Sequence, residues 1–125
     1  MKSLGEAELE IMQVIWNSDS AVTSNYILKE LEGKRRWSLS TLMTSLARLS
    51  AKEFVKCDRT SGTNMYSYII SESEYKASAG TGFLKSLYNN SICNMVASLY
   101  NDKKLSDEDI KELKNYLNEL GDDKK

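Results

Sequence analysis

Hydrophobic residues recur at helical spacing up to Ala51 and at the two-residue spacing of β-strands directly after it. Leu9, Met12 and Trp16 lie at i, i+3 and i+7, which predicts a first helix. Two short runs of strand formers around a polar turn at residues 60–64 predict a β-hairpin. This order of periods indicates a mainly α fold that contains one small β-hairpin.

Two polar breaks divide the helical region into three short helices. After the break NSDSA, Thr23 or Ser24 caps a second helix, and Gly33 ends it. The basic turn KRR then leads to Trp37 and to Ser38, a good N-cap for a third helix. Three helices followed by a hairpin is the order of a winged helix, whose third helix enters the DNA major groove and whose hairpin flanks it.

The third helix, in the stretch SLSTLMTSLARLSAKEFVK, has two unlike sides. One side carries the four leucines of a predicted buried stripe: Leu39, Leu42, Leu46 and Leu49. The opposite side carries small hydroxyl residues and one arginine, with no acid before Glu53. Small side chains allow close approach to DNA, hydroxyls bond phosphates or base edges, and arginine pairs with guanine. We interpret this side as a DNA-reading face; the alternative is an ordinary exposed surface rich in Ser and Thr. The predicted reading residues are Ser38, Ser40, Thr41, Met43, Thr44 and Arg48.

Positive charge is concentrated around this helix. The net charge of the chain is −1, but the segment from Lys29 to Arg59 holds eight basic and four acidic residues, net +4, which leaves −5 elsewhere. Basic residues here are either solvated charges or phosphate contacts, and their place beside the third helix favours contact. The predicted phosphate-binding residues are Lys34, Arg35, Arg36, Lys52, Lys56 and Arg59.

Composition excludes several other classes of protein. A hydrophobic content of 41% over 125 residues is typical of a folded chain. The absence of histidine removes the usual general base, so neither an enzyme nor a metal or cofactor site is predicted. Cys57 and Cys93 lack C-x-x-C spacing, which favours reduced thiols. We find neither a membrane span nor an export signal and expect a cytoplasmic protein.

The remainder of the chain, from Ser71, predicts three amphipathic helices. We therefore expect a DNA-binding domain over residues 1–71 and a helical domain over residues 72–125. Three short helices enclose a poor core by themselves, and a second copy of the chain is the simplest cover for their apolar faces. The predicted dimer interface consists of Phe83, Leu84, Leu87, Ile92, Met95, Val96, Leu99, Ile110, Leu113 and Leu117.

Several motifs together resemble the penicillinase repressor family. They are LGEAELEIMQVIW, ILKELEG, WSLSTLMTSLARLSAKEFV, SESEY, FLKSLYNNS and LSDEDIKEL, and they run from Leu4 to Leu120. The resemblance implies a winged-helix domain, a helical dimerisation domain, and a dimer that represses β-lactamase or other antibiotic-resistance genes from a palindromic operator. It also implies a membrane sensor-protease pathway whose cleavage of the repressor frees the operator.

Departures from the family pattern modify these expectations. The family often has Pro, Lys and Thr after the Trp-Ser pair and a polar residue two places later; here these are Leu39, Ser40, Thr41 and Met43. Thr44 and Arg48 fit the pattern, so the resemblance implies the same docking on a different operator. Glu53 replaces the glycine that commonly follows the third helix in the family. Gly62 replaces an arginine of the family's wing, which leaves Arg59 as the wing contact. Ser98-Leu99 aligns with the Asn-Phe bond that is cleaved in the β-lactam repressors. The C-x-C motifs of copper-responsive members are absent.

An alternative function is a protein-interaction adaptor that retains the winged-helix scaffold without binding DNA, because fold does not fix function. The weak overall charge is the feature that favours it. A DNA-binding protein should be inactivated by an acid on the third helix, whereas an adaptor of this kind should tolerate one.

Overall fold

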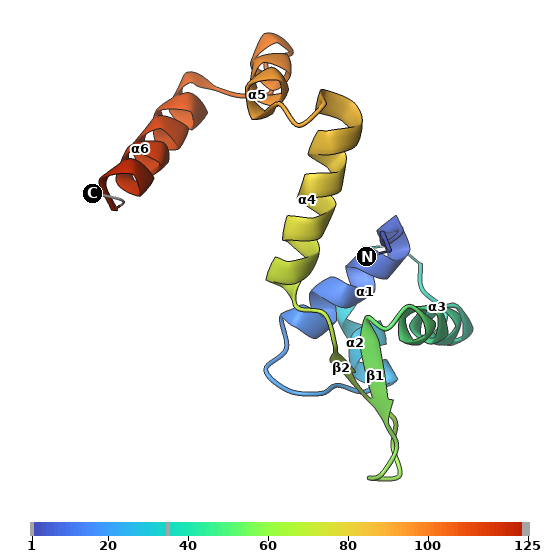
Figure 1. The fold of residues 1–125 in the computed structure, drawn as a ribbon. Helices are drawn as coiled ribbons and strands as arrows, with labels where there is room; N and C mark the ends of the chain where they lie inside the picture. Colours follow the sequence, from blue (N-terminus) through green and yellow to red (C-terminus); the bar gives the residue numbers. More distant parts are fainter. Residues whose placement is uncertain (1, 35, 124–125) are drawn as a thin grey trace. The chain divides into compact units, whose positions relative to one another are not determined.

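The computed structural model describes residues 2–34 and 36–123 and divides into two compact units, residues 1–79 and residues 80–125. The order of elements is α1 (Glu6–Trp16), α2 (Ser24–Glu30), α3 (Leu39–Ala51), β1 (Val55–Asp58), β2 (Met65–Tyr68), α4 (Glu72–Tyr88), α5 (Ile92–Asn101) and α6 (Asp107–Asp123), as Figure 1 shows. The mainly α fold with one β-hairpin is therefore confirmed. Within the described ranges, each helix is too short or too polar to cross a bilayer.

Side-chain caps set the starts of the second and third helices. Thr23 Oγ1 accepts a hydrogen bond from the backbone N–H of Tyr26 at 3.1 Å, and Ser38 Oγ accepts one from Thr41 at 3.1 Å. Each bond satisfies one of the free N–H groups in the first turn of a helix. The N-cap predicted at Ser38 is confirmed, and it determines that α3 begins at Leu39.

One hydrophobic core holds the three helices and the hairpin of the first unit together. Its largest fully buried side chains are Phe54, Ile11, Met12, Ile15, Ile27, Leu31, Leu42, Leu46, Leu49 and Val55. Both tryptophans pack at its edge, and Trp16 Nε1 donates to the carbonyl of Ile70 at 3.0 Å. The leucine side of α3 is thus fixed to α1 and α2, and its opposite side faces outward.

Leu39 departs from the predicted buried stripe. Its side chain is 48% exposed, whereas Leu42, Leu46 and Leu49 are at most 1% exposed. Leu39 is the first residue of α3 and lies before the turn that meets the core. The small side chain of Ser45, which is 7% exposed, lies on the buried side instead.

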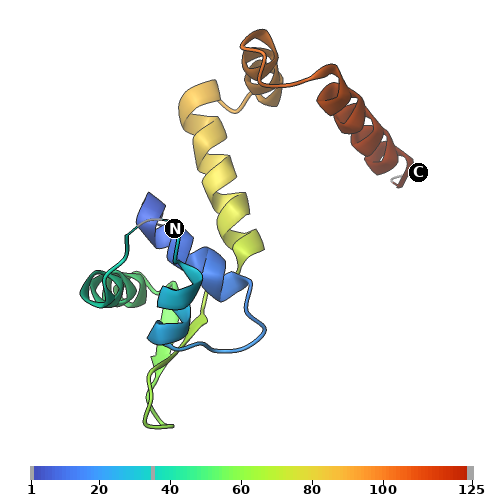
Figure 2. The ribbon, with the colours of Figure 1, turned by 180° about the vertical axis from the view of Figure 1, so that it is seen from behind.

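The β-hairpin is antiparallel and short. Val55 pairs with Tyr68 and Asp58 with Met65, and a bridge between Val22 and Tyr66 ties the hairpin to the segment before α2. The second strand ends at Tyr68. Figures 1 and 2 show the hairpin loop projecting beyond the three helices of its unit.

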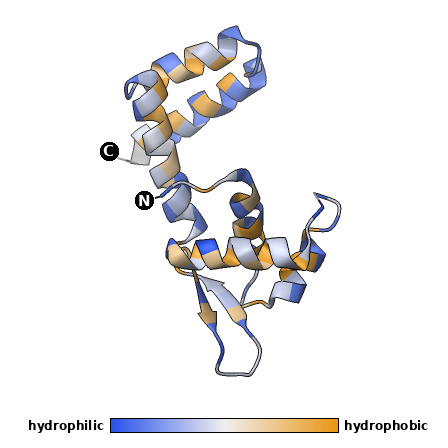
Figure 3. Ribbon diagram, turned by 90° about the vertical axis from the view of Figure 1, so that its right-hand side faces the viewer, coloured by the Kyte–Doolittle hydropathy of each residue, from blue (hydrophilic) through white to orange (hydrophobic). Residues whose placement is uncertain are grey.

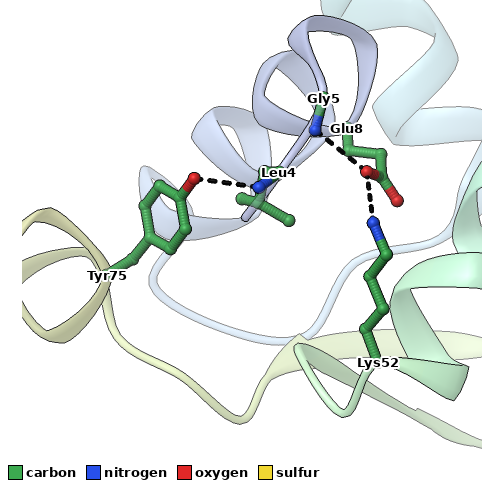
Figure 4. Close-up of polar contacts among 5 residues, drawn as sticks. All are labelled: Leu4, Gly5, Glu8, Lys52 and Tyr75. Atoms are coloured by element: carbon green, nitrogen blue, oxygen red, sulfur yellow. Dashed lines mark hydrogen bonds and ion pairs between the residues drawn. The ribbon is translucent and has the colours of Figure 1, made fainter. Parts of the chain in front are cut away.

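The first turns of α4 belong to the first unit. Tyr75 packs against Trp16 in a tilted arrangement and against Phe54 edge-to-face, with ring centroids 6.0 and 5.7 Å apart. Its hydroxyl accepts a hydrogen bond from the backbone N–H of Leu4 at 2.9 Å (Figure 4). The compact unit therefore extends past residue 71 to residue 79. The assignment of DNA binding to residues 1–71 and of dimerisation to residues 72–125 stays a prediction.

The second unit contains the end of α4 and the two helices α5 and α6. Ser91 caps α5, and Ser106 and Asp109 form the reciprocal hydrogen bonds of a capping box at the start of α6, at 3.0 and 2.9 Å. No described residue of α4, α5 or α6 in this unit is fully buried. Figure 3 shows hydrophobic residues recurring along its helices. The apolar surface of this unit is consequently left without a cover in a single chain.

Candidate nucleic-acid interface

The outward side of α3 presents a continuous acid-free surface. On this side, six exposed residues lie between the N-cap and the last turn: Ser38, Ser40, Thr41, Thr44, Ala47 and Arg48. Five of these are predicted reading residues, and the sixth, Ala47, lies beside Arg48. Arg48 supplies the only positive charge within α3 itself. A helix surface with short side chains and one arginine can approach a DNA groove closely without repelling phosphate.

Met43 is placed differently from the other predicted reading residues. Its side chain is half-buried and packs against the core. Only the remaining exposed part of this side chain is available to a base, and an apolar side chain contacts a thymine methyl rather than a polar base edge.

Hydroxyl groups at the start of α3 are held by one another and by the backbone. Ser38 Oγ donates to Thr41 Oγ1 at 2.8 Å, and Thr44 Oγ1 donates to the carbonyl of Ser40 at 3.0 Å. A hydroxyl has one donor and two acceptor positions. Thr44 therefore offers its methyl group and an acceptor at this surface, while its donor is used within the helix.

The exposed basic residues lie on both sides of α3 in the sequence. Lys34 and Arg36 precede it, Lys56 is on β1, and Arg59 is in the hairpin loop. The predicted contact Arg35 lies outside the described residues. At the end of β1, Asp58 accepts hydrogen bonds from the N–H and hydroxyl of the loop residue Thr60 at 2.9 and 2.7 Å, which lower the pKa of Asp58. Figure 3 shows a loop without strongly hydrophobic residues.

Lys52 has a protein partner that its position in the sequence does not reveal. Its Nζ lies 2.7 Å from Glu8 Oε1, and the same oxygen accepts a hydrogen bond from the backbone N–H of Gly5 at 3.0 Å (Figure 4). Burial raises the pKa of Glu8, but the hydrogen bonds from Lys52 and Gly5 and the positive charges of Lys52 and Arg48 outweigh it, so the pKa is lowered overall. Glu8 is thus a carboxylate at neutral pH.

Glu8 is one of two acidic residues in the first turn of α1. Its spacing of three residues from the N-cap Gly5 is the signal of a carboxylate that returns to the N-cap N–H. The pairing with Lys52 spans 44 residues and has no local signal.

No group of three or more Cys, Asp or Glu residues in the described ranges is arranged to hold a metal ion. The two cysteines are free, with Cys57 half-buried on β1 and Cys93 exposed on α5.

In the second unit, α5 and α6 border an open apolar groove. Among the predicted dimer residues, the groove is lined by Ile92, Met95, Val96, Leu99, Ile110, Leu113 and Leu117. Phe83, Leu84 and Leu87 lie on α4, and the side chains of Phe83 and Leu87 are 50% and 64% exposed. Exposed apolar area of this kind is typical of a surface that a partner covers.

Comparisons with known proteins relate this architecture to one family. The model of the penicillinase repressor family matches residues 4–119. The penicillinase repressor of Bacillus licheniformis is 34% identical over 122 residues, which cover 98% of this chain and 94% of that protein. The methicillin resistance regulatory protein MecI of Mammaliicoccus sciuri is 31% identical over 117 residues, which cover 92% of this chain and 93% of that protein.

Two solved structures resemble the first unit. The DNA-binding domain of the repressor BlaI aligns with a TM-score of 0.51 and 36% identity, covering 60% of this chain and 94% of that domain. Monomeric Bacillus licheniformis BlaI in complex with the blaP half-operator aligns with a TM-score of 0.51 and 35% identity, covering 59% of this chain and 89% of that one. The winged helix predicted from the order of elements is confirmed by these likenesses.

Proposed function

The chain belongs to the penicillinase repressor family, and we propose that it is a homodimeric transcriptional repressor of β-lactamase or other antibiotic-resistance genes. It is not an enzyme, because the family consists of transcriptional repressors. Its partner is operator DNA, and it acts in the cytoplasm, where promoters are accessible. Each protomer binds one half of a palindromic operator, since a two-fold symmetric dimer matches a two-fold symmetric site.

The acid-free outward side of α3 is the observation that carries this proposal. The three buried leucines on the opposite side of α3 anchor the helix to the core, so this side faces outward. Exposed basic residues precede and follow the helix in the sequence. Ser40, Thr41, Thr44 and Arg48 face the major groove, while Lys34, Arg36, Lys56 and Arg59 contact phosphates. Ser38 fixes the start of the helix through its cap.

Binding to DNA is tested by mobility shifts with the promoter DNA upstream of the protein's own gene. We expect a shift whose affinity falls steeply with salt, because phosphate contacts release counterions. Thr44→Glu should abolish the shift, since it places a negative charge on the acid-free side. Asn115→Glu, on the exposed surface of α6, is the matched control and should bind normally. An unaffected Thr44→Glu protein would favour the adaptor function instead.

Arg48→Ala separates base reading from phosphate binding. A base contact predicts a loss of about 1 to 3 kcal/mol that is confined to operators with the contacted base. A small and uniform loss across all DNA sequences would show that Arg48 contacts phosphate only. Wild type and Arg48→Ala are each used to select operators from a random duplex library, and the selected sequences are compared.

Dimerisation through the second unit covers its apolar surface. The α5–α6 groove together with Phe83, Leu84 and Leu87 forms the interface in this proposal. Burial of these side chains against a second copy removes apolar area from water, which is the main favourable term in association.

Release of the operator proceeds, in this proposal, by cleavage at Ser98-Leu99 under the control of a membrane sensor-protease pathway. Both residues lie inside α5, where Ser98 is exposed and Leu99 is half-buried in the groove. A protease needs an extended segment, so cleavage here requires local unfolding of α5. Ala97→Gly should favour this local unfolding without changing the Ser98-Leu99 bond itself, and mass spectrometry of cleaved fragments from induced cells identifies the site.

A further inference from the structure

We propose that Lys52 positions the recognition helix α3 by pairing with Glu8 and does not bind phosphate. The inference rests on the proposed DNA binding and replaces the role that position alone gives to Lys52. Lys52 is the C-cap residue of α3, and its backbone N–H donates to the carbonyl of Arg48 at 2.9 Å. Its side chain reaches from the end of α3 to the first turn of α1 (Figure 4).

Both charged groups are largely withdrawn from water. The side chain of Glu8 is 12% exposed and that of Lys52 is 26% exposed, with 2.7 Å between Nζ and Oε1. The other carboxylate oxygen, Oε2, is buried and has no hydrogen-bond partner among the described residues. Lys52 is consequently the main compensation for the charge of Glu8.

The energetic balance favours the pair over a phosphate contact. Transfer of Lys52 to a phosphate would leave the partly buried carboxylate of Glu8 without its ion-pair partner, which is unfavourable. A solvent-exposed ion pair between Lys52 and a phosphate would contribute much less free energy. The ammonium group of Lys52 has two further N–H donors that could contact a phosphate. The Lys52–Glu8 pair carries no net charge, however, so it does not attract DNA electrostatically.

The pair instead fixes where the last turn of α3 lies. Glu8 Oε1 also accepts the hydrogen bond from Gly5, so one oxygen joins the start of α1 to the end of α3. Arg48 lies one turn before Lys52 on the same helix, on the side that faces DNA in the proposed function. Small displacements of a functional side chain have large effects on binding, so loss of the pair should weaken DNA binding through Arg48.

Salt dependence distinguishes a positioning residue from a phosphate ligand. The slope of log Kd against log salt reports the number of neutralised phosphates, at about 0.9 for each one. We expect Lys52→Met, which keeps the aliphatic stem, to weaken binding about tenfold at an unchanged slope. Lys56→Met, at an exposed residue of β1, is the matched control and should lower the slope by about 0.9.

The probe is a duplex that the wild-type protein selects from a random library, and each variant is measured at a temperature where circular dichroism shows it folded. Glu8→Gln makes the test two-sided, because it frees Lys52 while keeping the shape of the side chain. Positioning predicts weaker binding by Glu8→Gln at the wild-type slope. If Lys52→Met does not fold, this variant carries the test alone.

Two results would overturn the inference while DNA binding stands. One is a slope lowered by about 0.9 in Lys52→Met together with tighter binding by Glu8→Gln, which identifies a phosphate ligand. The other is wild-type affinity in both folded variants, which identifies a pair that only stabilises the fold. An absence of salt-sensitive binding by the wild-type protein would instead refute the proposed function, and this inference with it.

Discussion

Glu53 adopts a backbone conformation that favours glycine. Its φ is +64°, and it lies at the end of α3, where its N–H bonds to the carbonyl of Ser50 at 3.0 Å and that of Phe54 to the carbonyl of Leu49 at 2.9 Å. This pair of bonds is the Schellman motif, whose left-handed residue is usually glycine because a Cβ is strained there.

We expect Glu53→Gly to raise the free energy of unfolding by about 1 kcal/mol, since relief of strain exceeds the added freedom of the unfolded chain. Urea denaturation of the full chain measures the change. Glu53→Ala is the control, because it removes the charge but keeps the Cβ and should give no such gain. Equal stabilisation by both variants would attribute the effect to the charge.

Glu8 makes stability depend on pH in the acid range. Its pKa is lowered below the ordinary value of 4.5 in the folded state, so the folded protein binds fewer protons at this group than the unfolded chain. The contribution of Glu8 to stability is therefore fully present above pH 4.5 and is lost as the pH falls through the lowered pKa.

Glu8→Gln should cost about 1 to 2 kcal/mol at pH 7, an intermediate value between exposed and buried ion pairs. The difference in free energy of unfolding between wild type and variant should shrink below pH 4.5. Urea titrations at a series of pH values measure it. Lys52→Met should reduce the same pH dependence from the other side of the pair, and a constant difference down to pH 3 would contradict this account.

At the scale of elements, local signals predicted the helices and missed the contacts between them. Thr23 and Ser38 cap their helices through hydrogen bonds to residues three positions later, so the local order of residues locates these starts. Leu39 was expected in the buried stripe because a helical projection takes no account of where the helix begins relative to its core. The Glu8–Lys52 pair depends on how α1 and α3 pack, which spacing does not encode.

Tyr75 joins the start of α4 to the rest of the first unit. Its ring contacts Trp16 and Phe54, and its hydroxyl accepts the N–H of Leu4 across 71 residues of sequence. Tyr75→Phe keeps the ring contacts and should lower the free energy of unfolding by about 1 kcal/mol through the lost hydrogen bond. Thermal unfolding of the full chain measures the change. Tyr116→Phe, at an exposed position of α6, is the control and should be neutral.

At the scale of the whole molecule, charge and apolar surface are divided between different parts of the chain. The segment around α3 carries the local excess of +4, whereas the apolar groove lies between α5 and α6. DNA binding and dimerisation are thus expected to be separable by mutation. The sequence predicted the amphipathic helices of the second unit, but periodicity does not say whether a helix covers its apolar face within one chain or between two.

Leu117→Glu tests this separation, because Leu117 lines the groove and is 54% exposed in the single chain. The change should leave each chain folded but place a negative charge in the dimer interface, where no opposite charge compensates it. Sedimentation equilibrium should give twice the 14.2 kDa of one chain for wild type and for the control Asn115→Glu, but a monomer for Leu117→Glu.

A monomeric variant should bind a half-operator as wild type does and a full palindrome much more weakly, since the second half-site is no longer bound intramolecularly. Mobility shifts on the two duplexes measure both affinities. Wild-type affinity of the Leu117→Glu monomer for the full palindrome would show that the second unit does not join the two DNA-binding units. Loss of half-operator binding would show that α6 also contributes to the DNA interface.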